Sequence, residues 1–178
     1  NKLENGQMSK THFSDILRFA LLAEYGGIWM DATIYLTDYL PKDIYNLPYY
    51  TLRGCFKEWE WSGFFQATGE QNDFFSCVRD TFYVYWKNHN QLITYLLIDC
   101  TMKAIYDLHP ELDNMIYSVK KVDNSVFLLN DEYLDTVYDD KKWNHIKEKT
   151  FIHKLSYKFM HESYIYNKKT FWGFILDE

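Results

Sequence analysis

The chain of 178 residues is 47% hydrophobic, which is enough for one domain with a core of its own. Its formal net charge of −6 argues against a protein that binds nucleic-acid phosphates over its whole surface. A local basic pocket for a diphosphate is compatible with that charge. Aromatic residues make up 20% of the chain, which fits an aromatic core or an exposed surface that stacks sugars or bases.

The three cysteines are far apart and form no metal-ligand pattern, so we expect reduced thiols in a cytosolic protein. No stretch is long and apolar enough to cross a bilayer, and no signal peptide opens the sequence. We therefore expect a cytoplasmic protein, and any association with the inner face of a membrane would be peripheral.

The first predicted helix covers residues 11–25, after a polar lead-in that contains Ser9 as a candidate N-cap. Its apolar residues wrap most of the circumference, which predicts a largely buried helix. Gly26 is a typical helix stop, and an apolar strand is predicted at 27–31.

The remaining elements alternate irregularly and show no internal repeat. We predict strands at 34–36, 49–52 and 150–155, and helices at 72–88, 91–108 and 111–119. The region that follows, to about residue 140, is poorly patterned, and 143–149 is short and charged. This mixture predicts a single α/β or α+β domain over residues 1–178, with helices on the faces of a sheet.

Asp15 and Arg18 lie three residues apart and share one face of the first helix. One interpretation is a local ion pair near the helix N-terminus. The alternative is a binding function, in which the carboxylate accepts sugar hydroxyls and the guanidinium meets a phosphate in fork geometry.

Asp31 ends the apolar run 28–30, and a carboxylate there must be paired, metal-bound or at a solvent crevice. In open α/β sheets such a crevice is the ligand site. Thr33 follows two residues later, so in a strand both side chains would point to the same face. A carboxylate with a hydroxyl is a weak site for a hard cation, which would need water, phosphate oxygens and another protein ligand.

Residues 9–38 resemble the signature of bacterial capsular polysaccharide synthesis glycosyltransferases, which are related to glycosyltransferase family 32 and to clostridial glucosylating toxins. The matching positions are Ser14-Asp15, Arg18, Tyr25-Gly26-Gly27 and Asp31. Weaker similarity continues through residues 85–99 and 151–158. The resemblance implies a GT-A fold, a nucleotide-sugar donor, and Mn²⁺ or Mg²⁺ as cofactor.

The same resemblance assigns roles to individual residues. Asp15 and Arg18 would contact the donor sugar and diphosphate, and Asp31 would lie at the metal and the ribose. His153 would be a further metal ligand, with Lys154 and Lys158 as phosphate partners. The second acid of the family's Asp-x-Asp motif is Thr33 here, although capsular relatives often have Asp-Ala-Thr.

In the resembling family, strands that hold the base precede the first helix. We therefore expect an N-terminally truncated domain whose exposed sheet edge could pair with a second copy of the chain.

Asp99 interrupts the apolar run 96–98, so it is either a buried carboxylate bonded to a helix terminus or an acceptor-side catalytic group with a raised pKa. Trp59, Trp61 and Gln66 could form an acceptor platform, although a core corner fits the two tryptophans equally well.

These residues predict a glycosyltransferase that moves a sugar from a nucleotide-sugar to a polysaccharide, oligosaccharide or lipid-linked glycan, with Asp31 and Asp99 as catalytic candidates. Rival hypotheses are a non-catalytic carbohydrate-binding or scaffold remnant, and a hydrolase with paired carboxylates such as Asp15 and Asp31.

Overall fold

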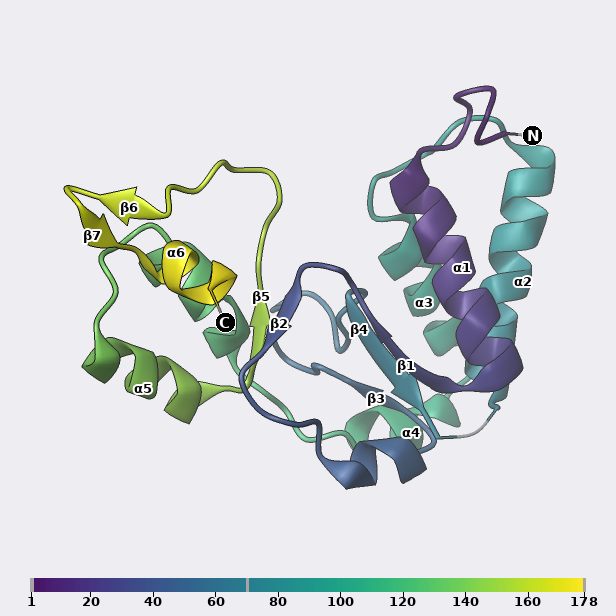
Figure 1. The fold of residues 1–178 in the computed structure, drawn as a ribbon. Helices are drawn as coiled ribbons and strands as arrows, with labels where there is room; N and C mark the ends of the chain where they lie inside the picture. Colours follow the sequence, from purple (N-terminus) through teal and green to yellow (C-terminus); the bar gives the residue numbers. More distant parts are fainter. Residues whose placement is uncertain (1, 70, 178) are drawn as a thin grey trace.

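The computed structural model describes residues 2–69 and 71–177, and small central sheets lie between two groups of helices, with the fourth helix beneath these sheets (Figure 1). The first three helices lie together on one side, and the C-terminal helices lie on the other. The α-helices are α1 Lys10–Tyr25, α2 Asp73–Asn88, α3 Leu97–Leu108, α4 Leu112–Tyr117, α5 Asp140–Lys149 and α6 Phe171–Leu176. Short 3-10 turns η1 Lys42–Asn46 and η2 Asn124–Phe127 and a π-turn η3 Leu129–Tyr133 link them.

The strands of the described residues form three small antiparallel sheets. One sheet has the order β1-β4-β3, and the others pair β2 with β5 and β6 with β7. The strands are β1 Gly27–Met30, β2 Ile34–Leu36, β3 Tyr50–Thr51, β4 Phe65–Thr68, β5 Ile152–Lys154, β6 Tyr164–Ile165 and β7 Lys168–Lys169. The β2–β5 pair matters for function, because it brings residue 154 beside the turn that follows β1.

Three apolar clusters hold these elements together. The largest lies between α1, α2 and α3 and includes Phe19, Phe75 and Met102, all fully buried. A second, around Phe65 and Ile152, joins the sheets, and a third, around Trp143 and Phe171, fills the C-terminal part. Aromatic side chains contribute to all three clusters, whereas others, such as Tyr39 and Tyr166, are exposed.

Helix α1 begins at the N-cap Ser9 and ends at Gly26, whose positive φ of 65° suits a residue without a Cβ atom. The expectation of a largely buried helix is wrong for one face. Phe19, Leu22 and Ala23 are buried, whereas a stripe at four-residue spacing stays exposed: Phe13, Leu17, Leu21 and Tyr25. A wrapped apolar pattern does not by itself say which faces find a partner.

Most of the predicted elements form, with shifts at their ends. The helix expected over 91–108 starts only at Leu97, because residues 89–96 are irregular and Tyr85 Oη holds them through bonds with Gln91 O and Ile93 N. The poorly patterned region after residue 119 contains η2 and η3. The sequence did not predict the hairpin β6–β7 or helix α6, because such short elements carry little periodic signal.

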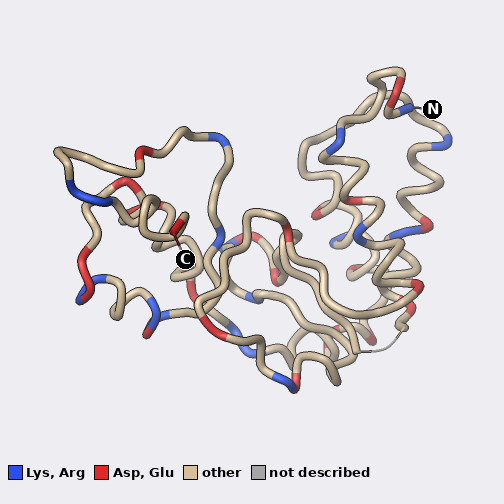
Figure 2. The backbone as a smooth tube through the Cα atoms, viewed as in Figure 1, with Lys and Arg blue, Asp and Glu red and all other residues tan. Residues whose placement is uncertain are grey.

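Basic and acidic residues are interspersed along the described backbone (Figure 2). The described residues contain no helix that is both long and apolar enough to cross a membrane. Cys55 is buried, Cys77 is half-buried and Cys100 is exposed, and all three are free thiols.

The N-cap of α1 offers a test of the helix that carries Asp15 and Arg18. Ser9 accepts a hydrogen bond from His12 N at 3.2 Å. We expect Ser9→Ala to lower the free energy of unfolding by about 1 kcal/mol, because a first-turn N–H loses its partner. Urea denaturation measures this change, and Ser9→Asn is the matched control that keeps the cap. Equal losses in both variants would contradict the capping role.

Candidate functional site

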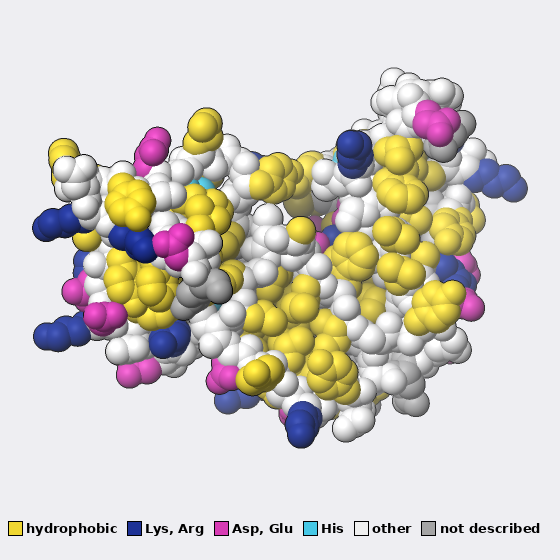
Figure 3. Space-filling model, in the orientation of Figure 1, with side chains coloured by type: hydrophobic (Ala, Val, Ile, Leu, Met, Phe, Trp, Pro, Cys, Tyr) yellow, Lys and Arg dark blue, Asp and Glu magenta, His cyan; other side chains and the backbone are white. Residues whose placement is uncertain are grey.

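A cavity of about 420 Å³ opens between α1, the turn after β1, the start of α3 and the segment after β5. The space-filling view shows a hollow there, between the two groups of helices (Figure 3). The volume lies within the range of about 300–1,000 Å³ that is typical of small-molecule sites. Six charged residues line it, namely Asp15, Asp31, Asp99, Arg18, Lys154 and Lys158. All six were candidates from sequence.

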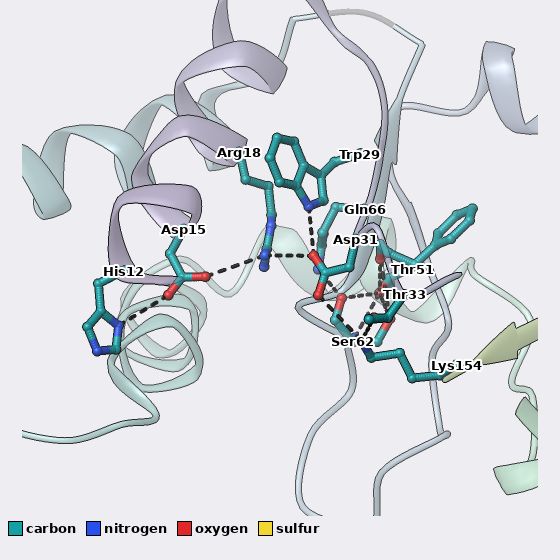
Figure 4. Close-up of polar contacts among 11 residues, drawn as sticks. His12, Asp15, Arg18, Trp29, Asp31, Thr33, Thr51, Ser62, Gln66 and Lys154 are labelled. Atoms are coloured by element: carbon teal, nitrogen blue, oxygen red, sulfur yellow. Dashed lines mark hydrogen bonds and ion pairs between the residues drawn. The ribbon is translucent and has the colours of Figure 1, made fainter. Parts of the chain in front are cut away.

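Arg18 is the buried centre of this group, with only 4% of its surface exposed. Its Nη2 lies 3.0 Å from Asp31 Oδ1 and 3.4 Å from Asp15 Oδ1, so one nitrogen ties helix α1 to the turn after β1 (Figure 4). The guanidinium lies over the Trp29 ring, 5.2 Å from its centroid. Arg18 Nε is buried without a partner among the described residues. Burial lowers the pKa of Arg18, and both carboxylates oppose that shift.

Asp31 is held from three sides. Its Oδ1 accepts hydrogen bonds from Arg18 Nη2 and from the Trp29 indole, both at 3.0 Å. Its Oδ2 lies 3.6 Å from Lys154 Nζ. Asp31 follows the last residue of β1, and its backbone N–H donates to Phe64 O at 3.0 Å. The carboxylate therefore has a fixed orientation at the edge of the cavity.

Asp15 completes the helical side of the site. Its carboxylate lies between Arg18 and His12, whose Nδ1 is 3.6 Å from Asp15 Oδ2. Burial raises the pKa of Asp15, while Arg18 lowers it by a smaller amount. The local ion pair and the binding function suggested by the sequence are therefore compatible, because the paired groups also line the cavity.

Lys154 reaches the site from β5. The strand register pairs residue 154 with Ile34, and Leu155 N donates to Thr33 O at 2.8 Å. The ammonium group contacts Thr33 Oγ1 and lies 5.3 Å from the centre of the Phe64 ring. Burial lowers the pKa of Lys154, and Asp31 opposes that shift. Lys154 therefore contacts both Thr33 and Asp31. Thr33 lies in a turn and not in a strand.

Asp99 lies in the first turn of α3, where the helix dipole favours a carboxylate. Its Oδ1 accepts a hydrogen bond from the Trp61 indole at 3.2 Å. Burial raises the pKa of Asp99, and the bond from Trp61 opposes that shift. Asp99 therefore lies at a helix start, accepts a bond from Trp61 and lines the cavity, and its acceptor-side role stays a prediction.

The placement of His153 beside Asp31 is wrong. His153 is fully buried on the opposite face of β5 from Lys154, because successive side chains of a strand point to opposite faces. Its ring lies against Tyr35 and Trp143, and its Nε2 is 3.3 Å from Thr37 Oγ1. Burial lowers its pKa to about 4, so it is a neutral core residue.

The acceptor platform of Trp59, Trp61 and Gln66 is also wrong. Trp61 and Gln66 are almost completely buried, and Gln66 Nε2 donates to Ser62 O at 2.8 Å. Trp59 stacks on Trp61 with ring centroids 5.8 Å apart and packs against the large apolar cluster. The core-corner alternative describes the two tryptophans, and Trp61 contributes indirectly by holding Asp99.

The cavity lining also includes residues that were not singled out from the sequence, among them Asn130 and Gly63. Asn130 lines the cavity, and its Oδ1 is buried without a partner among the described residues. The sequence held a signal for Asn130, because this polar residue directly follows the apolar run 126–129, as Asp99 follows the apolar run 96–98. Gly63 allows a close approach, since a Cβ atom there would lie 3.2 Å from Arg18 Nη1.

The residues around Asp31 do not by themselves fit a divalent cation. No group of three or more His, Cys, Asp or Glu side chains in residues 2–69 and 71–177 is arranged to hold a metal ion. Both oxygens of Asp31 already face cationic groups, and Thr33 supplies only a hydroxyl. A hard cation needs about six oxygen ligands.

The cavity has a volume that is typical of small-molecule sites and a lining rich in paired charges. The model of the capsular polysaccharide synthesis protein family matches residues 1–173, so the chain belongs to this family. That membership gives the protein a role in capsular polysaccharide synthesis. No curated protein and no solved structure matches the chain.

Removal of the Arg18 charge tests whether the guanidinium holds the site together. We expect Arg18→Met to lower the free energy of unfolding by about 3 kcal/mol, because Asp15 and Asp31 both lose their guanidinium partner in a partly buried site. Chemical denaturation measures the loss. The double variant Asp15→Asn/Arg18→Met is expected to recover part of it. A double variant as unstable as the sum of both single variants would contradict the pairing.

Asp99 provides a pH-dependent test. Burial raises its pKa in the folded chain above the unfolded value, so the wild type loses stability as pH rises through the folded pKa. Asp99→Asn keeps an acceptor for Trp61 and removes this titration. We therefore expect the stability of Asp99→Asn relative to wild type to increase from acidic to neutral pH in thermal unfolding scans. A pH-independent difference would contradict the raised pKa.

Proposed function

We propose that the chain is a glycosyltransferase that moves a sugar from a nucleotide-sugar donor to a glycan acceptor during capsular polysaccharide synthesis. The observation that carries this proposal is the meeting of Asp15, Arg18, Asp31 and Lys154 in one cavity. Membership of the capsular polysaccharide synthesis family supports it. We also propose a GT-A-like arrangement, with the donor over the end of β1.

The donor diphosphate would lie against the cationic groups of the cavity. Arg18, Lys154 and Lys158 all line this space. Charge-assisted bonds from these groups would stabilise the negative charge that develops on the leaving diphosphate. Because Arg18 is fixed before the donor arrives, little reorganisation is needed during transfer.

The carboxylates would serve the sugars. Asp15 and Asp31 can accept hydrogen bonds from donor hydroxyls, and Asp99 lines the same cavity from the start of α3. The raised pKa of Asp99 suits a group that takes a proton from an acceptor hydroxyl as transfer proceeds. Proximity and orientation would supply much of the remaining rate enhancement.

Asp31→Asn tests the proposal directly. We expect transfer from a nucleotide-sugar to fall by about 100-fold or more, because the amide no longer aligns Arg18 and Lys154 for the donor. Release of nucleoside diphosphate from a panel of nucleotide-sugars with capsular oligosaccharide acceptors measures the rate. Asp38→Asn is the matched control, since Asp38 is exposed and lies outside the cavity. Full activity in Asp31→Asn would overturn the assignment.

Ligand binding separates the enzyme from a non-catalytic glycan-binding scaffold. We expect isothermal titration calorimetry to show binding of uridine diphosphate that Arg18→Lys weakens about tenfold or more, because the fork geometry of the guanidinium is lost. A scaffold would bind oligosaccharide and show no binding of nucleotide. That result would favour the scaffold hypothesis.

A further inference from the structure

The ammonium group of Lys154 lies between Asp31 and Thr33, the first and last residues of the Asp-Ala-Thr motif. We propose that Lys154 takes the position of a divalent cation in the donor site, so that the chain binds a nucleoside diphosphate without metal. This inference rests on the proposed function and adds that the positive charge beside Asp31 belongs to the protein itself.

The first argument is the state of Asp31. Its Oδ1 accepts from Arg18 and Trp29, and its Oδ2 faces Lys154 at 3.6 Å. A metal at this carboxylate would have to displace Lys154 and would then lie close to two cationic side chains. Such a placement is opposed by charge repulsion in a half-buried pocket.

The second argument is that Lys154 has a built position. Its backbone is held in the β2–β5 ladder opposite Ile34, and the next residue bonds to Thr33 O. Its side chain is only 21% exposed and lies near the Phe64 ring. A flexible surface lysine would pay the cost of ordering when a ligand binds, whereas Lys154 is already ordered.

The third argument is the shortage of other ligands. His153 lies on the far face of β5, and Thr33 replaces the second acid of the motif. Among the described residues, no cluster of three potential metal ligands includes Asp31. The position that lacks a carboxylate is instead contacted by the lysine. A hydroxyl can accept a hydrogen bond from an ammonium group without adding a negative charge.

The arrangement accounts for how an anion can enter a cavity that already holds carboxylates. Asp31 is balanced by Lys154 and Arg18, whereas Lys158 lines the cavity and forms no ion pair within the described part of the chain. Oxygens of a diphosphate can therefore meet Lys154 and Lys158 together, beside the Arg18 guanidinium that lines the same cavity. These groups supply the charge that a bound cation would otherwise provide.

The test is calorimetric titration of the wild type with uridine diphosphate and with inorganic pyrophosphate, in excess EDTA and in excess MnCl₂. We expect the Kd values in the two buffers to agree within about twofold. This difference is small, because a tenfold change in Kd corresponds to about 1.4 kcal/mol of binding free energy. Lys154→Gln is expected to weaken binding in EDTA by about tenfold to a hundredfold, as one charge-assisted bond is lost. Mn²⁺ should restore part of this loss, because Asp31 Oδ2 is then free.

Lys141→Gln is the matched control, because Lys141 is exposed on α5 and the substitution removes one positive charge, as Lys154→Gln does. This variant should bind as the wild type does. Circular dichroism and thermal unfolding verify that each variant is folded. If the wild type binds uridine diphosphate only with Mn²⁺, the role of Lys154 is overturned and the proposed function stands. If neither probe binds in either buffer, the proposed function and this inference both fail.

Discussion

The buried guanidinium of Arg18 is the constraint on which the rest of the site depends. One nitrogen lies within 3.4 Å of Asp15 and 3.0 Å of Asp31, and so joins a helix to the turn that follows the adjacent strand. A buried charge is tolerated only when it is paired, so the two carboxylates must stay where they are. Their fixed positions in turn shape the cavity and orient the groups that face a ligand.

Lys154 extends this constraint to the C-terminal half of the chain. The series Asp15, Arg18, Asp31, Lys154 alternates in sign and connects α1, the turn after β1 and β5 (Figure 4). Elements more than a hundred residues apart in sequence therefore meet at one carboxylate. Under the proposed function, these ordered charges would stabilise the charge on a leaving diphosphate without large movements of the protein.

Local sequence patterns predicted many of the helices and strands and several charged residues of the cavity. The helix that begins near Ser9, the stop at Gly26 and the strand that follows were readable because caps, glycines and apolar runs act over a few residues. Asp15, Arg18 and Asp31 were readable because ionisable groups beside apolar runs need partners. The sequence did not predict the exposed stripe of α1 or the burial of Trp61 and Gln66, because burial depends on which elements pack against each face.

The sequence by itself determined the family, the first helix and strand, and the identity of the charged residues that line the cavity. The tertiary structure alone decided which residue of β5 faces that cavity. His153 and Lys154 are neighbours, yet the alternation of a strand sends the first into the core and the second to Asp31. The register of β5 against β2 fixes that choice, and register arises from pairing between segments that are distant in the chain.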